Sequence, residues 1–193
     1  MDIHLIRHGK TLANEKRLFC GSTDVPLSPA GMEELERLIA RNIYPSADMF
    51  FTSGLLRARQ TASLIYGDTP KTQLSDLNEY DFGLFEMKSY DELKNRADFQ
   101  AWISDQAGVT VCPQGESGLI FKQRVMRGFN TVLDEAHRAG KKSALAVCHG
   151  GVIVRIMEWL FPDTRNFYEW QPEPGRGYTI IYDSENFYTY REI

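Results

Sequence analysis

The sequence predicts an α/β protein of three layers, with helices on both faces of a doubly wound, mainly parallel sheet. Short apolar segments rich in β-branched and aromatic residues alternate along the chain with amphipathic segments of helical period. The 193 residues suffice for one sizeable α/β domain, and they contain no repeat, low-complexity tract or linker. We therefore expect a single domain over residues 1–193, with a small helical cap inserted around residues 78–114.

The first half of the chain predicts two strand–helix units and the start of a third. Ser28 is a suitable N-cap, and Pro29 suits the first turn of the helix that follows it. Gly67 closes the second predicted helix. The expected elements are a strand at 2–7, a helix at 28–42, a strand at 47–53, a helix at 54–67 and a weaker strand at 73–77.

The second half of the chain predicts the cap, the longest helix and the remaining strands. Gly140 ends the longest stretch of helical period, and the apolar segment after it is the most strand-like of the sequence. The expected elements are short helices near 89–95 and 97–104, a helix at 117–139, a strand at 142–151, a helix at 152–160, and an antiparallel hairpin of 177–183 and 186–193.

Composition and charge narrow the class of partner. A net charge of −4 argues against nucleic acid or an anionic membrane as the main partner, and no stretch has the length of a membrane span or the pattern of a signal peptide. The three cysteines, Cys20, Cys112 and Cys148, are odd in number and widely spaced, so a disulfide framework is not expected. These features predict a cytoplasmic protein; they do not define its oligomeric state.

Two predicted strands end in a histidine followed by glycine, at His8 and at His149. Ligands of open α/β sheets bind at the carboxyl ends of strands, and the helix that begins near Gly150 could offer its first amides to an anion. The alternative for each imidazole is a buried, hydrogen-bonded ring without a catalytic role. That alternative fits His4 and His137, to which we assign no function.

Two further polar segments follow predicted strands. Arg57 and Arg59 lie in the first turns of a helix, where cations oppose the helix dipole at a cost of a few tenths of a kcal/mol that a bound anion would offset. A solvated surface role is the expectation for Arg59. Glu79 follows the weak strand and would serve as a general acid if burial raised its pKa, whereas Asp81 and Glu86 are interpreted as ordinary loop acids.

These segments together resemble the histidine phosphatase superfamily, in the branch that includes cofactor-dependent phosphoglycerate mutases. The motifs "RHGKTLAN", "SGLLRARQTA", "LNEYDFGLFE" and "VCHGG" occur in the order and approximate spacing of that family. The likeness runs from Ile3 to about Ile156 and includes the loop "GSTDVPLSPAG" and the "GES" at 115–117. One tripeptide would be weak support, but four linked motifs are specific.

The resemblance implies a mechanism. His8 would attack phosphorus to give a phosphohistidine, and Arg7, Arg57 and His149 would hold the phosphoryl oxygens. Glu79 would protonate the leaving oxygen and then activate water. Residues expected to contact the substrate besides these are Asn14, Gly150, Ser22 and Thr23. Neither a metal nor another cofactor is expected, because arginines and histidines supply the positive charge.

The expected reaction is hydrolysis of a small phosphorylated metabolite. Mutases of the family carry Asn after the second His-Gly and a pair of arginines in a longer insertion, whereas this chain has Gly151 and no adjacent arginines in 88–114. The short chain and the loop at 21–31 look similar to alpha-ribazole phosphatases and to broad-specificity relatives. The alternatives are a phosphoglycerate mutase, a non-catalytic sensor of phosphorylated ligands, and a cysteine phosphatase using Cys148. The last is disfavoured because six residues, rather than five, separate Cys148 from Arg155.

Several positions depart from the family pattern. Lys10 stands where many relatives carry Glu, which predicts a more positive pocket mouth, and Phe85 and Met87 replace a common Trp and Gly around Glu86. Aromatic side chains crowd the segment after Glu79. They are expected either to form a lid over the substrate or to pack the core of the cap, at Tyr80, Phe82, Phe85, Tyr90, Phe99 and Trp102.

Overall fold

The computed structural model describes residues 1–182 and 188–193, and in them one sheet of six strands has the order β3-β2-β4-β1-β5-β6. The strands are β1 (Asp2–Arg7), β2 (Met49–Thr52), β3 (Thr72–Gln73), β4 (Ser143–Cys148), β5 (Gly177–Tyr182) and β6 (Tyr188–Glu192). Strands β1 to β4 pair in parallel, and β5 pairs antiparallel with both β1 and β6. The mainly parallel sheet is confirmed, as is the terminal hairpin, although its predicted residues Asp183, Asn186 and Phe187 lie outside the described ranges.

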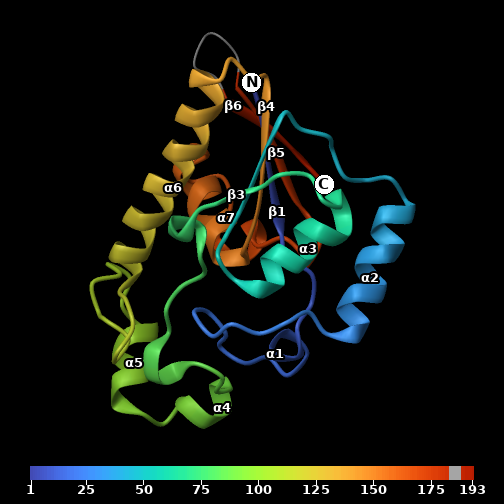
Figure 1. Cartoon of the computed structure of the whole chain (residues 1–193). Helices are drawn as coiled ribbons and strands as arrows, with labels where there is room; N and C mark the ends of the chain where they lie inside the picture. Colours follow the sequence, from blue (N-terminus) through green and yellow to red (C-terminus); the bar gives the residue numbers. More distant parts are fainter. Residues whose placement is uncertain (183–187) are drawn as a thin grey trace.

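Helices cover both faces of this sheet, as the sequence predicts (Figure 1). They are α1 (Leu12–Glu15), α2 (Pro29–Ala40), α3 (Leu56–Tyr66), α4 (Tyr90–Leu93), α5 (Ala97–Ile103), α6 (Gly118–Arg138), α7 (Gly150–Leu160) and α8 (Phe167–Trp170). Neighbouring residues of β1 show the two faces, because successive side chains of a strand point in opposite directions. Leu5 packs in the core beneath α6 and α7, whereas Ile6 packs against α3.

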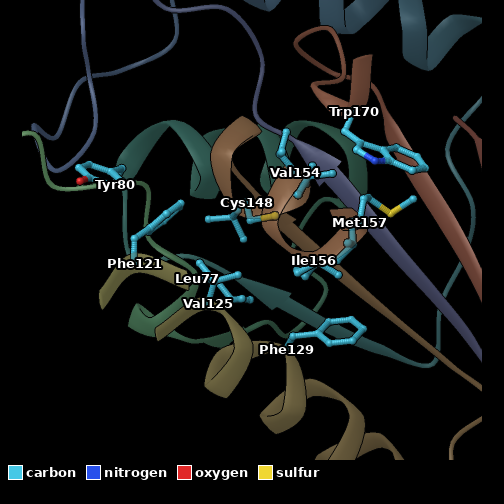
Figure 2. Close-up of a cluster of buried hydrophobic side chains, with 14 of the residues drawn as sticks. Leu77, Tyr80, Phe121, Val125, Phe129, Cys148, Val154, Ile156, Met157 and Trp170 are labelled. Carbon is cyan, nitrogen blue, oxygen red and sulfur yellow. The ribbon is translucent and has the colours of Figure 1, made fainter. Parts of the chain in front are cut away.

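The larger core lies between the sheet and the pair α6 and α7. Figure 2 shows Val125 and Phe129 of α6 together with Ile156 and Met157 of α7 and the side chain of Cys148 at the end of β4. All five side chains are almost completely removed from solvent. Burial of this apolar surface fixes the distance between α7 and the sheet, and thereby the place where the chain passes from β4 into α7.

The capping residues explain where the predicted helices begin and end. Ser28 accepts a hydrogen bond from the amide of Gly31 at the start of α2, and Ser117 does the same for Ile120 at the start of α6. Gly67 ends α3 with φ +57°, a conformation that favours glycine. These boundaries agree with the expected ones to within a few residues.

Two expectations about elements are wrong in detail, and two short helices are not predicted by the sequence. The weak strand predicted at 73–77 is a two-residue β3 followed by a 3₁₀ turn over Ser75–Leu77, because Leu77 turns inward to pack against α6. The strand predicted at 142–151 ends at Cys148, because His149 already serves as the N-cap of α7. Helices α1 and α8 have four residues each, too few to show a helical period, and both begin with a capping box.

The segment 78–114 forms the predicted cap, with α4 and α5 at the end of the molecule where α1 also lies (Figure 1). Its aromatic rings pack on one another and on Phe19, with ring centroids 5.3 Å apart for Phe85 and Phe99 and 5.9 Å apart for Tyr80 and Trp102. The Trp102 indole N–H donates to the Tyr80 hydroxyl at 2.9 Å. The aromatic segment is therefore the core of the cap.

None of the helices in residues 1–182 and 188–193 combines the length and the hydropathy needed to span a lipid bilayer.

Candidate active site

The two His-Gly segments lie side by side at the carboxyl ends of neighbouring strands. Arg7 of β1 is in register with Cys148 of β4, so His8 and His149 both follow directly after the paired residues. Their ring centroids are 5.1 Å apart, and both side chains are buried. Parallel pairing of β1 with β4 thus brings together two imidazoles that are separated by most of the sequence.

The His8 ring has one unprotonated nitrogen, whose electron pair can accept a hydrogen bond or attack an electrophile. Its Nδ1 lies 2.6 Å from the carbonyl oxygen of Gly9, and since a carbonyl only accepts, Nδ1 carries the proton. Nε2 therefore accepts, and the Arg57 Nε–H donates to it at 3.3 Å. Burial, reinforced by the charges of Arg57 and Arg7, holds the pKa of His8 well below 6.5. The ring is accordingly neutral and able to act as a nucleophile.

The guanidinium of Arg57 is buried and held by backbone carbonyls. Its Nη1 donates to the carbonyl of Thr23 at 2.9 Å, and its Nη2 donates to the carbonyl of Gly21 at 2.7 Å. The Thr61 hydroxyl donates to the Arg57 carbonyl and accepts from the Gly9 amide, which ties α3 to the turn after His8. A cation fixed in this way needs little reorganisation to stabilise an anion.

Arg7 and His149 each retain a buried nitrogen without a hydrogen-bond partner in the described part of the chain, Nε of Arg7 and Nδ1 of His149. The other contacts of these side chains are firm: Arg7 Nη1 donates to the Pro172 carbonyl at 2.7 Å, and His149 Nε2 lies 2.7 Å from the Ser53 hydroxyl. Burial, with the charges of Arg57 and Arg7 and the His8 ring, also holds the pKa of His149 well below 6.5. An unpaired buried polar group costs about 1–3 kcal/mol, so two of them beside His8 indicate a ligand site.

Two glycines after His149 allow the approach of the neighbouring side chains. A Cβ on Gly150 would lie 3.3 Å from the Arg7 guanidinium, and a Cβ on Gly151 would lie 2.5 Å from Glu79 Oε1. The Gly151 amide donates to Glu79 Oε2 at 3.0 Å. A side chain at position 151 would crowd Glu79 Oε1, so the carboxylate would have to shift.

Glu79 is also held through its backbone. The Arg124 Nη2 donates to the Glu79 carbonyl at 3.2 Å and to Glu116 Oε1 at 2.6 Å. The Tyr80 amide donates to Glu79 Oε1 at 3.0 Å. Arg124 belongs to α6 and Glu116 to the predicted "GES" segment, so the longest helix fixes the carboxylate next to the start of α7.

The loop residues Ser22 and Thr23 lie beside Arg57, but their hydroxyls bond to acids. Ser22 Oγ donates to Asp81 Oδ1 at 2.9 Å, and Thr23 Oγ1 donates to Glu86 Oε2 at 2.7 Å. Thr23 reaches Arg57 with its backbone carbonyl instead.

Glu86, interpreted from the sequence as an ordinary loop acid, has a structural role in the loop at 21–23. The Glu86 carboxylate accepts hydrogen bonds from four backbone amides, those of Gly21, Ser22, Thr23 and Phe82. It therefore fixes the loop whose carbonyls hold Arg57.

Asn14 and Lys10, predicted to lie in the pocket and at its mouth, each have a polar partner in the structure. Asn14 Oδ1 accepts from the Thr11 amide at 3.0 Å, which leaves the Asn14 amide hydrogens without a partner within the ranges described. Lys10 Nζ pairs with Glu34 Oε2 at 2.7 Å, which offsets part of the positive charge predicted for this position.

Sequence reasoning missed several residues that support the site. Thr61 lies four positions after Arg57 on α3, so helical spacing was the available signal for it, whereas Ser53 shares only the "SGLLRARQTA" motif. Asp24 accepts from the Leu56 amide at 2.6 Å and so places a negative charge at the start of α3. The contacts of the Gly21 and Pro172 carbonyls could not be predicted, because backbone groups do not depend on the side-chain pattern.

Comparison with known proteins agrees with this geometry. Residues 3–189 match the family model of the histidine phosphatase superfamily (branch 1). The chain belongs to the histidine phosphatase superfamily. The match extends beyond the predicted end at Ile156 and includes β5 and the start of β6. The predicted family and the predicted class of enzyme, a phosphatase, are confirmed.

Individual histidine phosphatases similar to this chain include two types of enzyme. An adenosylcobalamin/alpha-ribazole phosphatase of Escherichia coli K12 is 32% identical over 157 residues, which cover 79% of this chain and 75% of that protein. A 2,3-bisphosphoglycerate-dependent phosphoglycerate mutase of Beijerinckia indica is 32% identical over 178 residues, covering 83% and 82%. The crystal structure of the alpha-ribazole phosphatase of Shigella flexneri superposes with a TM-score of 0.85 at 30% identity, over 99% of this chain and 95% of that one.

The cysteine phosphatase alternative does not fit this histidine phosphatase. Cys148 is fully buried, its side chain lies in the core of Figure 2, and burial raises the pKa of its thiol far above the usual range. A thiol that stays protonated and faces away from the pocket is a poor nucleophile.

Proposed function

We propose that this chain hydrolyses small phosphate monoesters through a phosphohistidine formed on His8. The observation that carries the proposal is the set of groups around one point: the electron pair of His8, the fixed guanidinium of Arg57, and the unpartnered buried nitrogens of Arg7 and His149. Two cations and two neutral imidazoles suit a tetrahedral anion.

In the first step, His8 Nε2 attacks phosphorus in line, and the bond from phosphorus to the leaving oxygen breaks. Arg57 Nε, which donates to Nε2 in the structure, turns its hydrogen bond to a phosphoryl oxygen when the substrate is bound. Arg7, Arg57 and His149 then stabilise the charge that shifts among the oxygens. Glu79 donates its proton to the leaving oxygen, so the alcohol departs neutral.

In the second step, the Glu79 carboxylate takes a proton from water, and the oxygen of that water attacks the phosphohistidine. The bond from phosphorus to Nε2 breaks, phosphate leaves, and both His8 and Glu79 return to their starting states. The Gly151 amide supports this double role, because it holds one oxygen of Glu79 at 3.0 Å while the side chain stays next to Arg7 and the pocket.

The leaving group would occupy a polar hollow beside Glu79 of about 330 Å³, lined in part by Ser22, Asn78, Asp81 and Arg124. Its size suits a small metabolite. The alpha-ribazole phosphatases among the relatives make alpha-ribazole phosphate the first substrate to examine. Asn14 and the Gly150 amide are assigned to the phosphoryl group, whereas Ser22 and Thr23 are assigned to the loop that positions Arg57.

A phosphoglycerate mutase is the second candidate, because a mutase is also among the relatives at 32% identity. A mutase must retain a phosphorylated product for a second transfer. Gly151 favours hydrolysis, since it adds no side chain beside the Glu79 carboxylate at the position where mutases of the family carry Asn.

The test is a panel of phosphorylated metabolites, including alpha-ribazole phosphate and phosphoglycerates, with release of inorganic phosphate as the readout. We expect phosphate release together with an acid-labile, base-stable phosphoprotein after rapid quenching. Binding of these compounds without turnover at every pH would identify a sensor instead. Transfer of phosphate between phosphoglycerates that is faster than its release would identify a mutase.

A further inference from the structure

We infer that Ser53 is a positioning residue that fixes the proton of His149 on Nδ1. Ser53 lies just beyond the end of β2, and its hydroxyl oxygen is 2.7 Å from His149 Nε2. Both side chains are fully buried. The inference about the proton stands on hydrogen bonds alone, and its consequence for catalysis rests on the proposed function.

The direction of the hydrogen bond follows from the partners of the hydroxyl. A serine hydroxyl has one proton to donate and can accept from others. The Leu55 amide, which can only donate, lies 3.4 Å from Ser53 Oγ and uses an acceptor position. In the described part of the protein, the Ser53 hydroxyl proton then has His149 Nε2 as its acceptor. The opposite direction would leave a buried hydroxyl proton unpaired, which is energetically costly.

This assignment gives the two histidines opposite functions. Nδ1 of His8 donates to the Gly9 carbonyl, so its Nε2 offers an electron pair. Nε2 of His149 accepts from Ser53, so its Nδ1, the buried nitrogen without a partner, offers a proton. Both rings are protonated at Nδ1 and they differ in which nitrogen is left for a ligand. One ring is thereby suited to attack phosphorus and the other to bind its oxygen.

The other tautomer of His149 would oppose binding. An electron pair on Nδ1 would face the negative oxygen of a phosphoryl group, whereas an N–H donates to it. Because burial and the nearby arginines keep the ring neutral, the protein cannot obtain a donor at Nδ1 by charging the ring. A neutral donor at this position requires a second group that occupies Nε2, and Ser53 is that group.

The same chain contains a matched pair outside the site. His4 Nδ1 lies 3.0 Å from the Thr179 hydroxyl, and both residues are buried. Thr179→Val thus removes a buried hydroxyl from a buried imidazole without touching the phosphoryl pocket. It is the control for a general effect of losing such a bond.

The first measurement is the tautomer of His149 by long-range ¹⁵N–¹H correlation of the full ¹⁵N-labelled protein near neutral pH. We expect the shift of a protonated nitrogen at Nδ1 and of an unprotonated nitrogen at Nε2. His149→Gln identifies which signals belong to this ring. The reverse pattern would overturn the inference, whether or not the protein is a phosphatase.

The second measurement compares Ser53→Ala with Ser53→Thr and Thr179→Val. Ser53→Ala should give a mixture of His149 tautomers and lower kcat/KM for p-nitrophenyl phosphate at least about tenfold, because a catalytic histidine in the wrong tautomer loses much more than that. Binding of inorganic phosphate should weaken in parallel. Ser53→Thr should recover both the tautomer and kcat/KM, while Thr179→Val changes the His4 signals alone.

The outcomes separate the two proposals. Full activity of Ser53→Ala, or an unchanged His149 tautomer in it, would refute the positioning role. Absence of turnover in the unaltered protein, together with the expected tautomer and with phosphate binding that depends on Ser53, would refute the proposed hydrolysis and keep the inference. Unfolding temperatures of all variants identify any loss that comes from the fold, and the tautomer of the unaltered protein decides the question if Ser53→Thr does not fold.

Discussion

His4 and His8 lie within five residues of each other on the same segment, yet their surroundings differ. Both side chains are buried, and burial lowers the pKa of both. His4 bonds to Thr179 and has Asp2 and Arg191 nearby, whose charges act in opposite directions. His8 faces Arg7 and Arg57, and both charges act in the same direction. Burial and a shifted pKa therefore do not distinguish the imidazole that we propose as nucleophile from a structural one, whereas the two fixed cations around His8 do.

The largest difference should come from replacing each of the two histidines, one at a time, by asparagine. We expect His8→Asn to lower turnover at least about 10³-fold, because no covalent intermediate can form. His4→Asn should leave the turnover of folded protein near that of the unaltered chain, while its unfolding temperature falls. Steady-state kinetics with p-nitrophenyl phosphate on purified, folded variants measures both. Equal losses for the two variants would break the distinction.

Glu79→Gln should come next in size, and its effect should depend on the leaving group. A general acid contributes about 10²–10⁴-fold where the leaving oxygen needs a proton. We therefore expect a loss of that order for alkyl phosphates and a much smaller one for p-nitrophenyl phosphate in the first step, measured as the pre-steady-state burst of nitrophenol. A loss that is the same for both substrates would remove Glu79 from the role of acid.

Arg57 and Arg59 allow a similar comparison within α3, because Arg57 is buried and Arg59 is exposed. Arg57→Ala should cost roughly 2–4 kcal/mol of transition-state stabilisation, the value for one preorganised donor. Arg59→Ala should change kcat/KM by less than about twofold, since a surface arginine contributes little. A kinetically silent Arg57→Ala would show that the pocket has been assigned wrongly.

The smallest effect concerns stability against pH. Burial lowers the pKa of His4, His8 and His149 below the ordinary 6.5, so in acid the unfolded chain binds these protons before the folded protein does. The free energy of unfolding that depends on these neutral rings is thus fully present above pH 6.5. Below that pH it declines by up to about 1.4 kcal/mol per pH unit for each histidine. Urea unfolding between pH 7.5 and 5 measures this slope. His4→Asn should remove one histidine's share.

Side-chain patterns predict those parts of the fold and site that repeat or cap. The strands β1 and β4 and the helix after Ser28 follow from apolar period and N-cap chemistry, although the predicted strand at 142–151 is three residues too long at its end. The convergence of His8 with His149 follows from parallel pairing, which the alternation of strands and helices predicts. Glycine after each histidine added the expectation of close approach, and the contact of Gly150 with Arg7 agrees with it.

Long-range contacts of backbone groups explain what the sequence did not predict. Glu86 looks like any loop acid until the loop at 21–23 folds onto it, since its partners are amides that every residue possesses. Lys10 predicts added positive charge at the pocket mouth, but Glu34 of α2 pairs with it and offsets part of that charge. Such partners become visible only when tertiary structure brings the two segments together.

The hydrogen bonds of Glu86 limit how the substrate specificity can change. This carboxylate belongs to the cap, yet it accepts hydrogen bonds from the loop whose carbonyls accept from Arg57. A shift of the cap at Glu86 would therefore also shift Arg57. Remodelling the cap around Glu86 to change the substrate would also loosen the loop whose carbonyls hold Arg57. The exposed side chains of α4 and α5 make no hydrogen bond to Glu86 among the described residues, so exchanges there would leave the loop at 21–23 in place.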